Sequence, residues 1–242
     1  MERIASAVLR DQNLGGEWSL EKLERCIFKR VTIEADRLEG AEFDRCQFYA
    51  TAFHVDRFEN CVFVGAAFAE PDSSESCLFR GTTFRQCTFT GCDLTAVRFE
   101  RCNLSSCRFE GCLLSDVVFQ KSAFHRSVSR DVDVCQFELI DSVCVNLDFS
   151  RSILTGADFS GSQFQGCDFT ESSLVRLRAR RALFEDCSLR DADLEHADLC
   201  GAELQGSYVG DARSLAGMRI FDTQTRALLK NLGVTVVRNW DE

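Results

Sequence analysis

The chain has 242 residues, of which 38 are acidic and 28 basic, giving a formal net charge of −10. Apolar residues make up 45% and charged residues 27%, which is typical of a soluble globular protein rather than a disordered one. The acidic balance argues against direct nucleic-acid binding, and no apolar run approaches the roughly 20 residues that a membrane span needs. The first residues lack the apolar core of a signal peptide, so we expect a cytoplasmic protein. Residues 1–22, which precede the repeat, are expected to form an N-terminal cap.

A large apolar residue recurs at every fifth position from Leu23 onward. The register slips by one residue before Phe79 and then continues to Val209. Of its 37 positions, 32 are Leu, Ile or Phe, and these include 19 of the 21 phenylalanines. The residue two positions earlier is small in 31 of the 37 cases. A period of five fits neither an α-helix nor the simple alternation of a strand.

The pattern small-x-large-x-x predicts a short extended segment with two inward side chains, followed by a polar corner. Four such segments close a square coil, and successive coils stack at the strand spacing of about 4.8 Å. Residues 23–209 then make about nine coils, with large side chains filling the centre. We therefore expect an all-β fold, a quadrilateral β-helix whose sheet edges are confined to its two ends.

This repeat resembles that of the pentapeptide-repeat proteins, whose motif is A(D/N)LXX. The segments ADFSG at 157–161, ADLEH at 192–196 and ADLCG at 197–201 match the motif almost letter for letter. The resemblance implies a right-handed quadrilateral β-helix, which agrees with the geometry inferred from the period.

Interruptions of the register predict local deformations of the walls. Segment 69–76 holds the only proline, and we expect a small insertion there, a bulge or loop on one corner. Between 129 and 147 the wall should deform, because the residues at the central positions are irregular and two large residues occupy small-residue slots. The central residues there are Ser129, Val134, Leu139 and Cys144, the misplaced large ones Phe137 and Leu147. Leu177 and Ala179 exchange sizes, which conserves the volume.

Two acidic residues, Asp36 and Asp56, fall in inward small-residue slots and should stack one coil apart. We favour an interpretation in which their side chains cap turn backbone and are partly exposed. The alternative is a strained pair of carboxylates with a raised pKa.

Eleven of the 14 cysteines fall in the small inward slot, where cysteine is interchangeable with Ala, Ser or Val. Spacings of five put neighbouring thiols on different walls, which excludes a zinc-ligand set. Thiols one coil apart point the same way, which is unfavourable for a disulfide, so we expect reduced thiols. The eleven are Cys26, Cys46, Cys61, Cys77, Cys87, Cys92, Cys102, Cys107, Cys112, Cys167 and Cys187.

Catalytic machinery is not apparent. The three histidines, His54, His125 and His196, all fall in outward positions, and the chain has no phosphate-binding loop, HExxH motif or nucleophile elbow. We expect no enzyme activity, cofactor or metal. A filled rod offers a long, rigid outer surface instead, which suits the binding of another macromolecule.

The negative charge is concentrated in the later coils. Residues 131–211 carry 16 acidic and 6 basic groups, whereas residues 1–130 are nearly balanced. Such a surface could enter a basic DNA-binding groove, although acidic outward positions could simply keep the rod soluble. The basic run at 176–181 is expected to bridge carboxylates on neighbouring coils, or else to contact an acid of the partner. The candidate partner-binding carboxylates are Asp148, Asp158, Asp168, Asp191, Asp193, Asp198 and Glu203.

The last segment, 210–242, departs from the repeat and predicts a C-terminal cap. A short helix is expected within 221–233, with Asp222 as N-cap and Gly233 as the stop, followed by a strand at 234–237. Its apolar side chains could cap the last coil, pair with a second copy, or do both. The candidate dimer contacts are Leu228, Leu229, Leu232, Val234 and Val236.

The tail sequence ALLKNLGVTV, together with LGGE at 14–17, is similar to the Qnr/MfpA/AlbG topoisomerase-protection group. That resemblance implies a homodimer joined through its C-terminal helices. It also implies binding to DNA gyrase or topoisomerase IV by imitating duplex DNA, and protection against quinolones or natural poisons. Qnr proteins carry long projecting loops, whereas only the 69–76 insertion is evident here, which leaves an MfpA- or AlbG-like role open. The alternative is a general protein-interaction scaffold, such as a regulator or a secreted effector.

Overall fold

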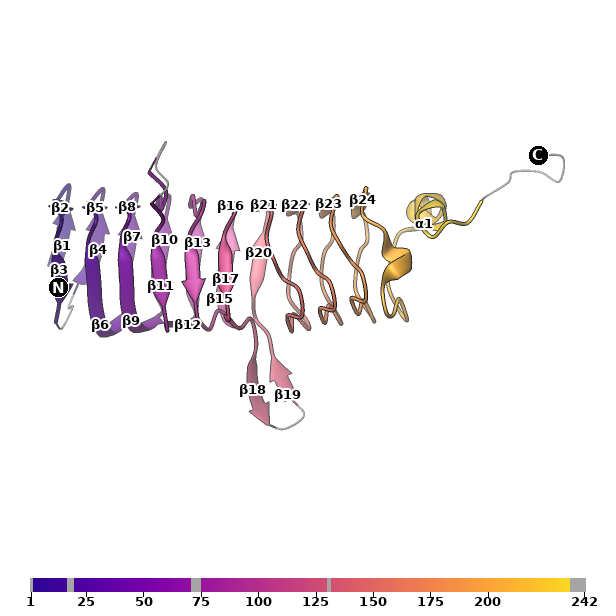
Figure 1. The fold of residues 1–242 in the computed structure, drawn as a ribbon, viewed down its shortest axis with the longest axis horizontal. Helices are drawn as coiled ribbons and strands as arrows, with labels where there is room; N and C mark the ends of the chain where they lie inside the picture. Colours follow the sequence, from indigo (N-terminus) through magenta and orange to yellow (C-terminus); the bar gives the residue numbers. More distant parts are fainter. Residues whose placement is uncertain (1, 17–19, 71–74, 130–131, 236–242) are drawn as a thin grey trace.

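The structure, a computed structural model, describes residues 2–16, 20–70, 75–129 and 132–235 and is a four-sided β-solenoid of about ten turns. Figure 1 shows the coils stacked along one axis, with the N-terminus at one end and a short helix at the other. Parallel strands on each side come from successive coils, so the predicted quadrilateral β-helix is confirmed. We number its faces 1 to 4 in the order in which the chain passes through them.

Faces 1 and 2 carry parallel ladders that run past the middle of the rod. Face 1 consists of β1 (Glu2–Ala5), β4 (Leu20–Glu24), β7 (Glu42–Asp44), β10 (Val62–Val64), β13 (Cys87–Thr90), β15 (Cys107–Glu110) and β20 (Glu138–Ile140). Face 2 consists of β2 (Val8–Arg10), β5 (Ile27–Lys29), β8 (Gln47–Tyr49), β16 (Leu113–Ser115), β21 (Val143–Val145), β22 (Gln163–Gln165), β23 (Leu183–Glu185) and β24 (Glu203–Gln205). Single bridges through Ala67 and Asp93 join β8 to β16.

Faces 3 and 4 are formed partly by strands and partly by single bridges between coils. Face 3 holds β3 (Asn13–Gly15), β6 (Thr32–Glu39), β9 (Ala52–Glu59), β11 (Leu78–Arg80), β14 (Arg98–Glu100) and β17 (Val118–Gln120). The long strands β6 and β9 continue around the corner onto face 4, where β12 (Thr83–Arg85) pairs with β9. The coils start ahead of Leu23, because β1, β2 and β3 pair with β4, β5 and β6.

The centre of the rod is a column of aromatic and aliphatic side chains, as the period predicted. Rings that follow one another on the same face lie parallel, as in Phe63 and Phe89, whose centroids are 4.5 Å apart with an interplanar angle of 3°. Rings on adjacent faces meet edge to face, as in Phe79 and Phe84 at 5.5 Å. Both arrangements are favourable for aromatic pairs. Leu177 and Ala179 are both fully buried, which confirms the exchange of sizes.

The small inward slot has a hydrogen-bonding role that the sequence analysis did not identify. All eleven predicted cysteines are buried, which confirms their placement. Most of their thiols approach a carbonyl oxygen in the preceding coil, as Cys46 Sγ does with Leu23 O at 3.3 Å. Hydroxyl groups in the same slot do the same, as in the 2.9 Å bond from Ser162 Oγ to Leu139 O. Cysteine therefore substitutes for serine as a donor between coils, besides being small and apolar.

Most corners are turned by a residue with positive φ, and many of these residues are glycines. Gly161 shows why glycine is needed at some of them. Its φ is +73°, and a Cβ atom there would lie 1.9 Å from Oδ1 of Asp141, the corner residue of the preceding coil. Glycine therefore provides both the backbone conformation and the space for the neighbouring side chain.

The register expected between Phe124 and Leu139 is wrong. Ser129 and Val134 are not central residues, because they belong to an antiparallel hairpin of β18 (Arg126–Ser129) and β19 (Val132–Val134). Figure 1 shows this hairpin projecting from the rod, on the side opposite the protrusion that follows β10. Phe109 pairs directly with Leu139, which returns the chain to the coil. The rod thus has a second projecting element besides segment 69–76, of which residues 71–74 lie outside the described part.

The wall deforms beside the hairpin, as predicted from the two misplaced large residues. Phe137 and Leu147 are buried in slots that mostly hold small side chains. The face 3 sheet ends at β17, and on face 4 the bridges stop at Ala123 and resume at Ile153. A cleft of about 270 Å³ lies where these ladders are interrupted and is lined by Phe119 among others. Here the two halves of the rod are joined by ladders on faces 1 and 2.

The C-terminal end is closed by a short helix, α1 (Thr225–Asn231), preceded by 3₁₀ turns at Val209–Asp211 and Asp222–Gln224. Asp222 is not the N-cap of the α-helix, since α1 begins three residues later and Asp222 Oδ1 accepts from Thr223 N–H. Gly233 ends the helix with φ +75°, as predicted. Val234 and Thr235 are not in a strand, and the rest of the expected strand lies outside the described residues.

Two side-chain amides missed by the sequence analysis fasten this helix to the last coil. Gln224 Oε1 accepts from Gly201 N–H at 2.7 Å, and its Nε2 donates to the carbonyl oxygen of Ala202 at 2.8 Å. Asn231, two helical turns later, accepts from Val209 N–H at 2.9 Å. These bonds satisfy backbone groups that the end of a solenoid otherwise leaves open.

Candidate functional site

The seven candidate carboxylates of the later coils lie on different sides of the rod. The predicted stacking is confirmed, because Asp148 bridges Asp168, and Arg178 lies between Asp158 and Asp198. The set nevertheless does not form one surface. Asp158 and Asp198 are on face 1, Glu203 on face 2, Asp148 and Asp168 on face 3, Asp193 on face 4, and Asp191 on the corner between faces 3 and 4.

Five of the seven also hold the backbone of their own coil. In each, Oδ1 accepts a hydrogen bond from the backbone N–H two residues later, as in the 2.8 Å contact between Asp168 and Thr170. This Asx turn explains why aspartate recurs at the second position of the repeat. The five are Asp148, Asp158, Asp168, Asp193 and Asp198.

Arginines neutralise three of the candidates. The ion pairs are Arg178 with Asp158 at 2.8 Å, Arg180 with Asp198 at 2.7 Å, and Arg213 with Asp193 at 3.0 Å. The predicted bridging role of the 176–181 run is therefore confirmed for Arg178 and Arg180. Burial acts to raise the pKa of Asp198, but hydrogen bonds from Arg180 and Cys200 outweigh it and hold the pKa below its usual value. Asp198 is thus a charged, locally compensated group.

Face 2 carries acidic groups that have no basic residue beside them on the same face. From Asp93 to Gly206, neither the strands of this face nor the corner that follows each of them contains a lysine or arginine, and all of these residues are described. Arg181 lies at its border, on the corner that leads in from face 1. No ion pair involves the carboxylates of this face within the described part of the chain. These are Asp93, Asp116, Asp141, Glu185, Asp186 and Glu203, with Asp141 on the same border as Arg181.

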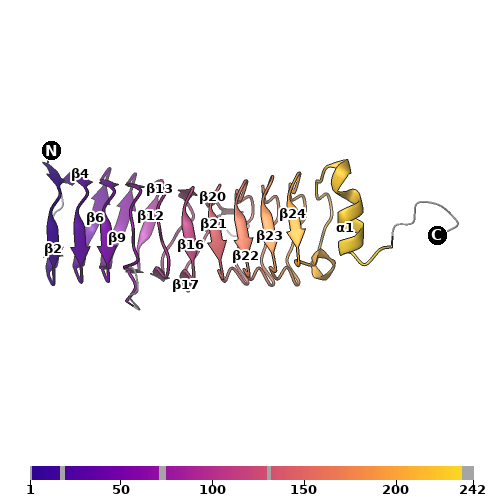
Figure 2. The same ribbon diagram turned by 90° about the horizontal axis from the view of Figure 1, so that it is seen from above.

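Exposed apolar side chains lie among these carboxylates. Leu113 on β16 and Val143 on β21 are direct register partners and are 39% and 38% exposed. Val145 and Leu183, on β21 and β23, are half-buried on the same face. Figure 2 looks onto this face and shows β16 and β21 to β24 following one another toward α1. These four side chains form an apolar strip, which Gln163 on β22 interrupts between Val143 and Leu183 and which carboxylates border.

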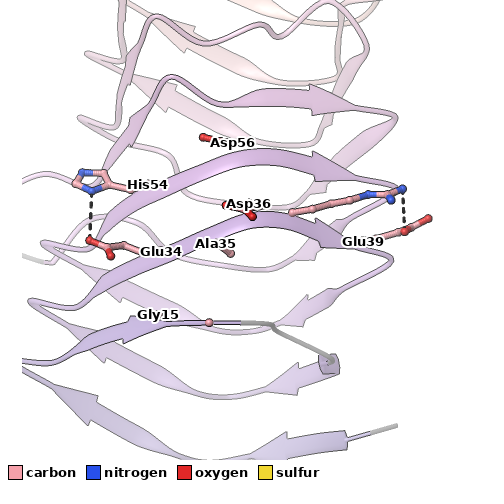
Figure 3. Close-up of a pocket in the computed structure, with 9 residues that line it drawn as sticks. Gly15, Glu34, Ala35, Asp36, Glu39, His54 and Asp56 are labelled. Atoms are coloured by element: carbon pink, nitrogen blue, oxygen red, sulfur yellow. Dashed lines mark ion pairs between the residues drawn. The ribbon is translucent and has the colours of Figure 1, made fainter.

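A second acidic region lies near the N-terminal end, where β6 and β9 cross the corner between faces 3 and 4. Ala35 and Val55 point inward there, so Asp36 and Asp56 are exposed, and their assignment to inward slots is wrong. Figure 3 shows both carboxylates along a groove of about 790 Å³, beside an ion pair between Glu34 and His54 at 4.0 Å. Because β6 and β9 run through the corner without a turn, the side chains of Asp36 and Asp56 point outward instead of inward.

The predicted dimer contacts divide into two groups. Leu228 and Leu232 pack against the core of their own rod and act as its cap. Leu229 is half-buried without joining that core, and Val234 is 46% exposed; Val236 lies outside the described residues. An apolar cleft of about 380 Å³ lies between β24 and α1 and is lined by Leu204, Ala227 and others. Apolar surface therefore remains at this end of the rod.

The histidines do not gather at a site. His54 and His196 are exposed, whereas His125, at the base of the hairpin, has a buried Nδ1 with no hydrogen-bond partner among the described residues. No helix in the described segments is both long and apolar enough to cross a membrane.

Two family models match the chain. "Pentapeptide repeat region" matches residues 82–159, and "Pentapeptide repeats (9 copies)" matches residues 148–208. No curated protein has a sequence that matches significantly.

Among solved structures, the chain is similar to QnrB1, described as a plasmid-mediated fluoroquinolone resistance protein. One trypsin-treated form aligns with a TM-score of 0.70 and 18% identity, over 97% of this chain and 99% of that one. A second gives 0.67 and 16%, over 98% and 100%. Full-length QnrB1 gives 0.54 and 18%, over 96% and 100%. At such identities the likeness concerns the fold.

Proposed function

Because the chain belongs to the pentapeptide-repeat proteins, we propose that it is a DNA-mimicking ligand of DNA gyrase or topoisomerase IV. In this role it binds the enzyme in the cytoplasm and protects it against quinolones or a natural topoisomerase poison. The observation that carries the proposal is the likeness to QnrB1 along nearly the whole of both chains, C-terminal segment included.

Two features of the rod support this role. The first is the uncompensated acidic face, which resembles the charge of a duplex and would be attracted to a basic DNA-binding groove. The second is the hairpin of β18 and β19. Qnr proteins carry long projecting loops, and the hairpin supplies a projecting element that was not evident in the sequence.

We further propose a homodimer joined at the C-terminal end. Leu229 and Val234 provide the apolar surface that a second copy can contact, since Leu228 and Leu232 pack against their own coil. The cleft between β24 and α1 lies beside them.

The test is a gyrase supercoiling and cleavage assay with purified protein, with and without a quinolone or a natural poison. Relief of poison-induced cleavage at micromolar protein is expected. If neither supercoiling nor cleavage responds, the proposal fails, and capture of a different partner in a pull-down would favour a general interaction scaffold instead.

A further inference from the structure

We propose that face 2 of the later coils, from Asp93 to Gln205, is the side of the rod that contacts the partner. The partner surface it fits is a protein groove lined by lysine or arginine with apolar side chains at its centre. This inference rests on the proposed function and deepens it, because it selects one of four sides and adds a contribution that duplex DNA does not provide.

Charge distinguishes this face from the other three. At the same level of the rod, faces 1, 3 and 4 carry arginines as well as carboxylates, and several of these pair, as Asp158, Glu171 and Asp193 do. Asp148 and Asp168 on face 3 have no ion pair among the described residues, but Arg151 and Arg190 lie on that side of the rod. On face 2 the nearest polar partners of the carboxylates are uncharged. Asn146 Nδ2 donates to Asp116 at 2.9 Å, and Gln205 Nε2 donates to Glu203 at 2.8 Å. Such bonds orient a carboxylate and leave its charge available to a cation.

The apolar strip indicates that the partner is a protein. Leu113 and Val143 expose more than a third of their surface side by side on neighbouring strands, with Val145 beside them on β21. Leu183 follows on the far side of Gln163. An exposed apolar patch with a polar rim is typical of a protein-binding surface. A surface that bound its partner through charge alone would gain nothing from aliphatic side chains in the middle of its charged face.

Rigidity favours the same side. Faces 1 and 2 keep their ladders across the level of the hairpin, face 2 through the pairing of β16 with β21, whereas the face 3 ladder is interrupted there. Five coil steps separate Asp93 from Glu203, or about 24 Å at the usual strand spacing. The carboxylates are thus held on a continuous sheet, so little conformational entropy is lost when they bind.

The test compares three variants with the wild type for binding to purified gyrase over a range of salt concentrations. The first removes three charges from face 2 by Asp116→Asn, Glu185→Gln and Asp186→Asn. Its matched control removes three from the N-terminal groove by Glu34→Gln, Asp36→Asn and Asp56→Asn. All six side chains lie on the outer surface, so circular dichroism should be unchanged in both. The third variant, Leu113→Ser with Val143→Ser, removes the centre of the strip.

We expect the face 2 charge variant to bind about tenfold more weakly at low salt and to show a shallower dependence of affinity on salt. The groove control should bind like the wild type. The serine variant should also bind about tenfold more weakly, but with the salt dependence of the wild type. Equal effects of the two charge variants, or wild-type binding by both face 2 variants, would overturn the choice of face. Absence of gyrase binding by the wild type itself would instead refute the proposed function, and the inference with it.

Discussion

Removing the projecting hairpin should separate the stability of the rod from its function. Ten residues, 126–135, are excised, and Gln136→Gly is added because the shortened corner then needs a residue with positive φ. The residues of β18 are exposed, Val128 by 60%. Of the excised residues whose side chains are described, only Val134 and Cys135 are half-buried, Cys135 against the core, so little apolar burial is lost. Surface changes of this kind alter the free energy of unfolding by about 0.5 kcal/mol, and a shorter loop favours folding by a similar amount.

The excised rod should therefore unfold within about 1 kcal/mol of the wild type, which is a shift in Tm of about 2–4 °C for a chain of this length. Protection of gyrase against a quinolone should fall at least tenfold, because under the proposed function the hairpin is a projecting element that contacts the enzyme. A variant in which residues 126–135 become a Gly/Ser loop of equal length keeps the native spacing and should lose protection equally. A large drop in Tm would show that the hairpin is part of the coil. Full protection by both variants would show that the partner does not use it.

The remaining predictions concern the interior and the C-terminal end. Gly161→Ala should lower the free energy of unfolding by about 2 kcal/mol, since it adds a steric conflict to the cost of positive φ. Gly91→Ala, where nothing lies within 4 Å, should cost only about 1 kcal/mol; equal costs in urea denaturation would contradict the steric argument. Burial raises the pKa of Cys77 to about 12, so iodoacetamide at pH 8 should label it in urea but not in the folded rod. Unfolded thiols ionise near pH 9 while this one stays protonated, so the free energy of unfolding should fall as pH rises above 9; a flat profile to pH 11 would argue against such burial. Leu229→Asp should give a monomer by light scattering with unchanged circular dichroism, and a mass equal to that of the wild type would count against the proposed dimer.

The hairpin shows where reasoning from the period stops. The insertion is ten residues long, which equals two repeats. The five-residue register therefore stays in phase on either side, and the sequence pattern cannot distinguish the insertion from two further repeats of the coil. Only the pairing of Phe109 with Leu139 reveals that residues between them leave the coil. Asp36 and Asp56 were misplaced for a related reason. Unbroken strands run through the corner there, and alternation along the strand then turns Ala35 and Val55 inward.

The acidic surface was also only partly predictable. The sequence located the excess of carboxylates in the later coils, but the aspartate of the repeat serves its own turn, and arginines one coil away neutralise several of those residues. Asp116 and Asp186 lie at corners, where the sequence pattern carries little information. Whether a carboxylate is free depends on which residues the neighbouring coils place beside it.

By itself the sequence determined the solenoid, its coil size and which side chains fill it, because each coil contacts only its neighbours and the same local pattern is repeated along the chain. Tertiary structure alone decided what projects from the rod, which carboxylates are free and how the last coil is closed. Those properties depend on the register between coils, which any insertion shifts, and on side chains such as Gln224 that act across gaps of more than twenty residues.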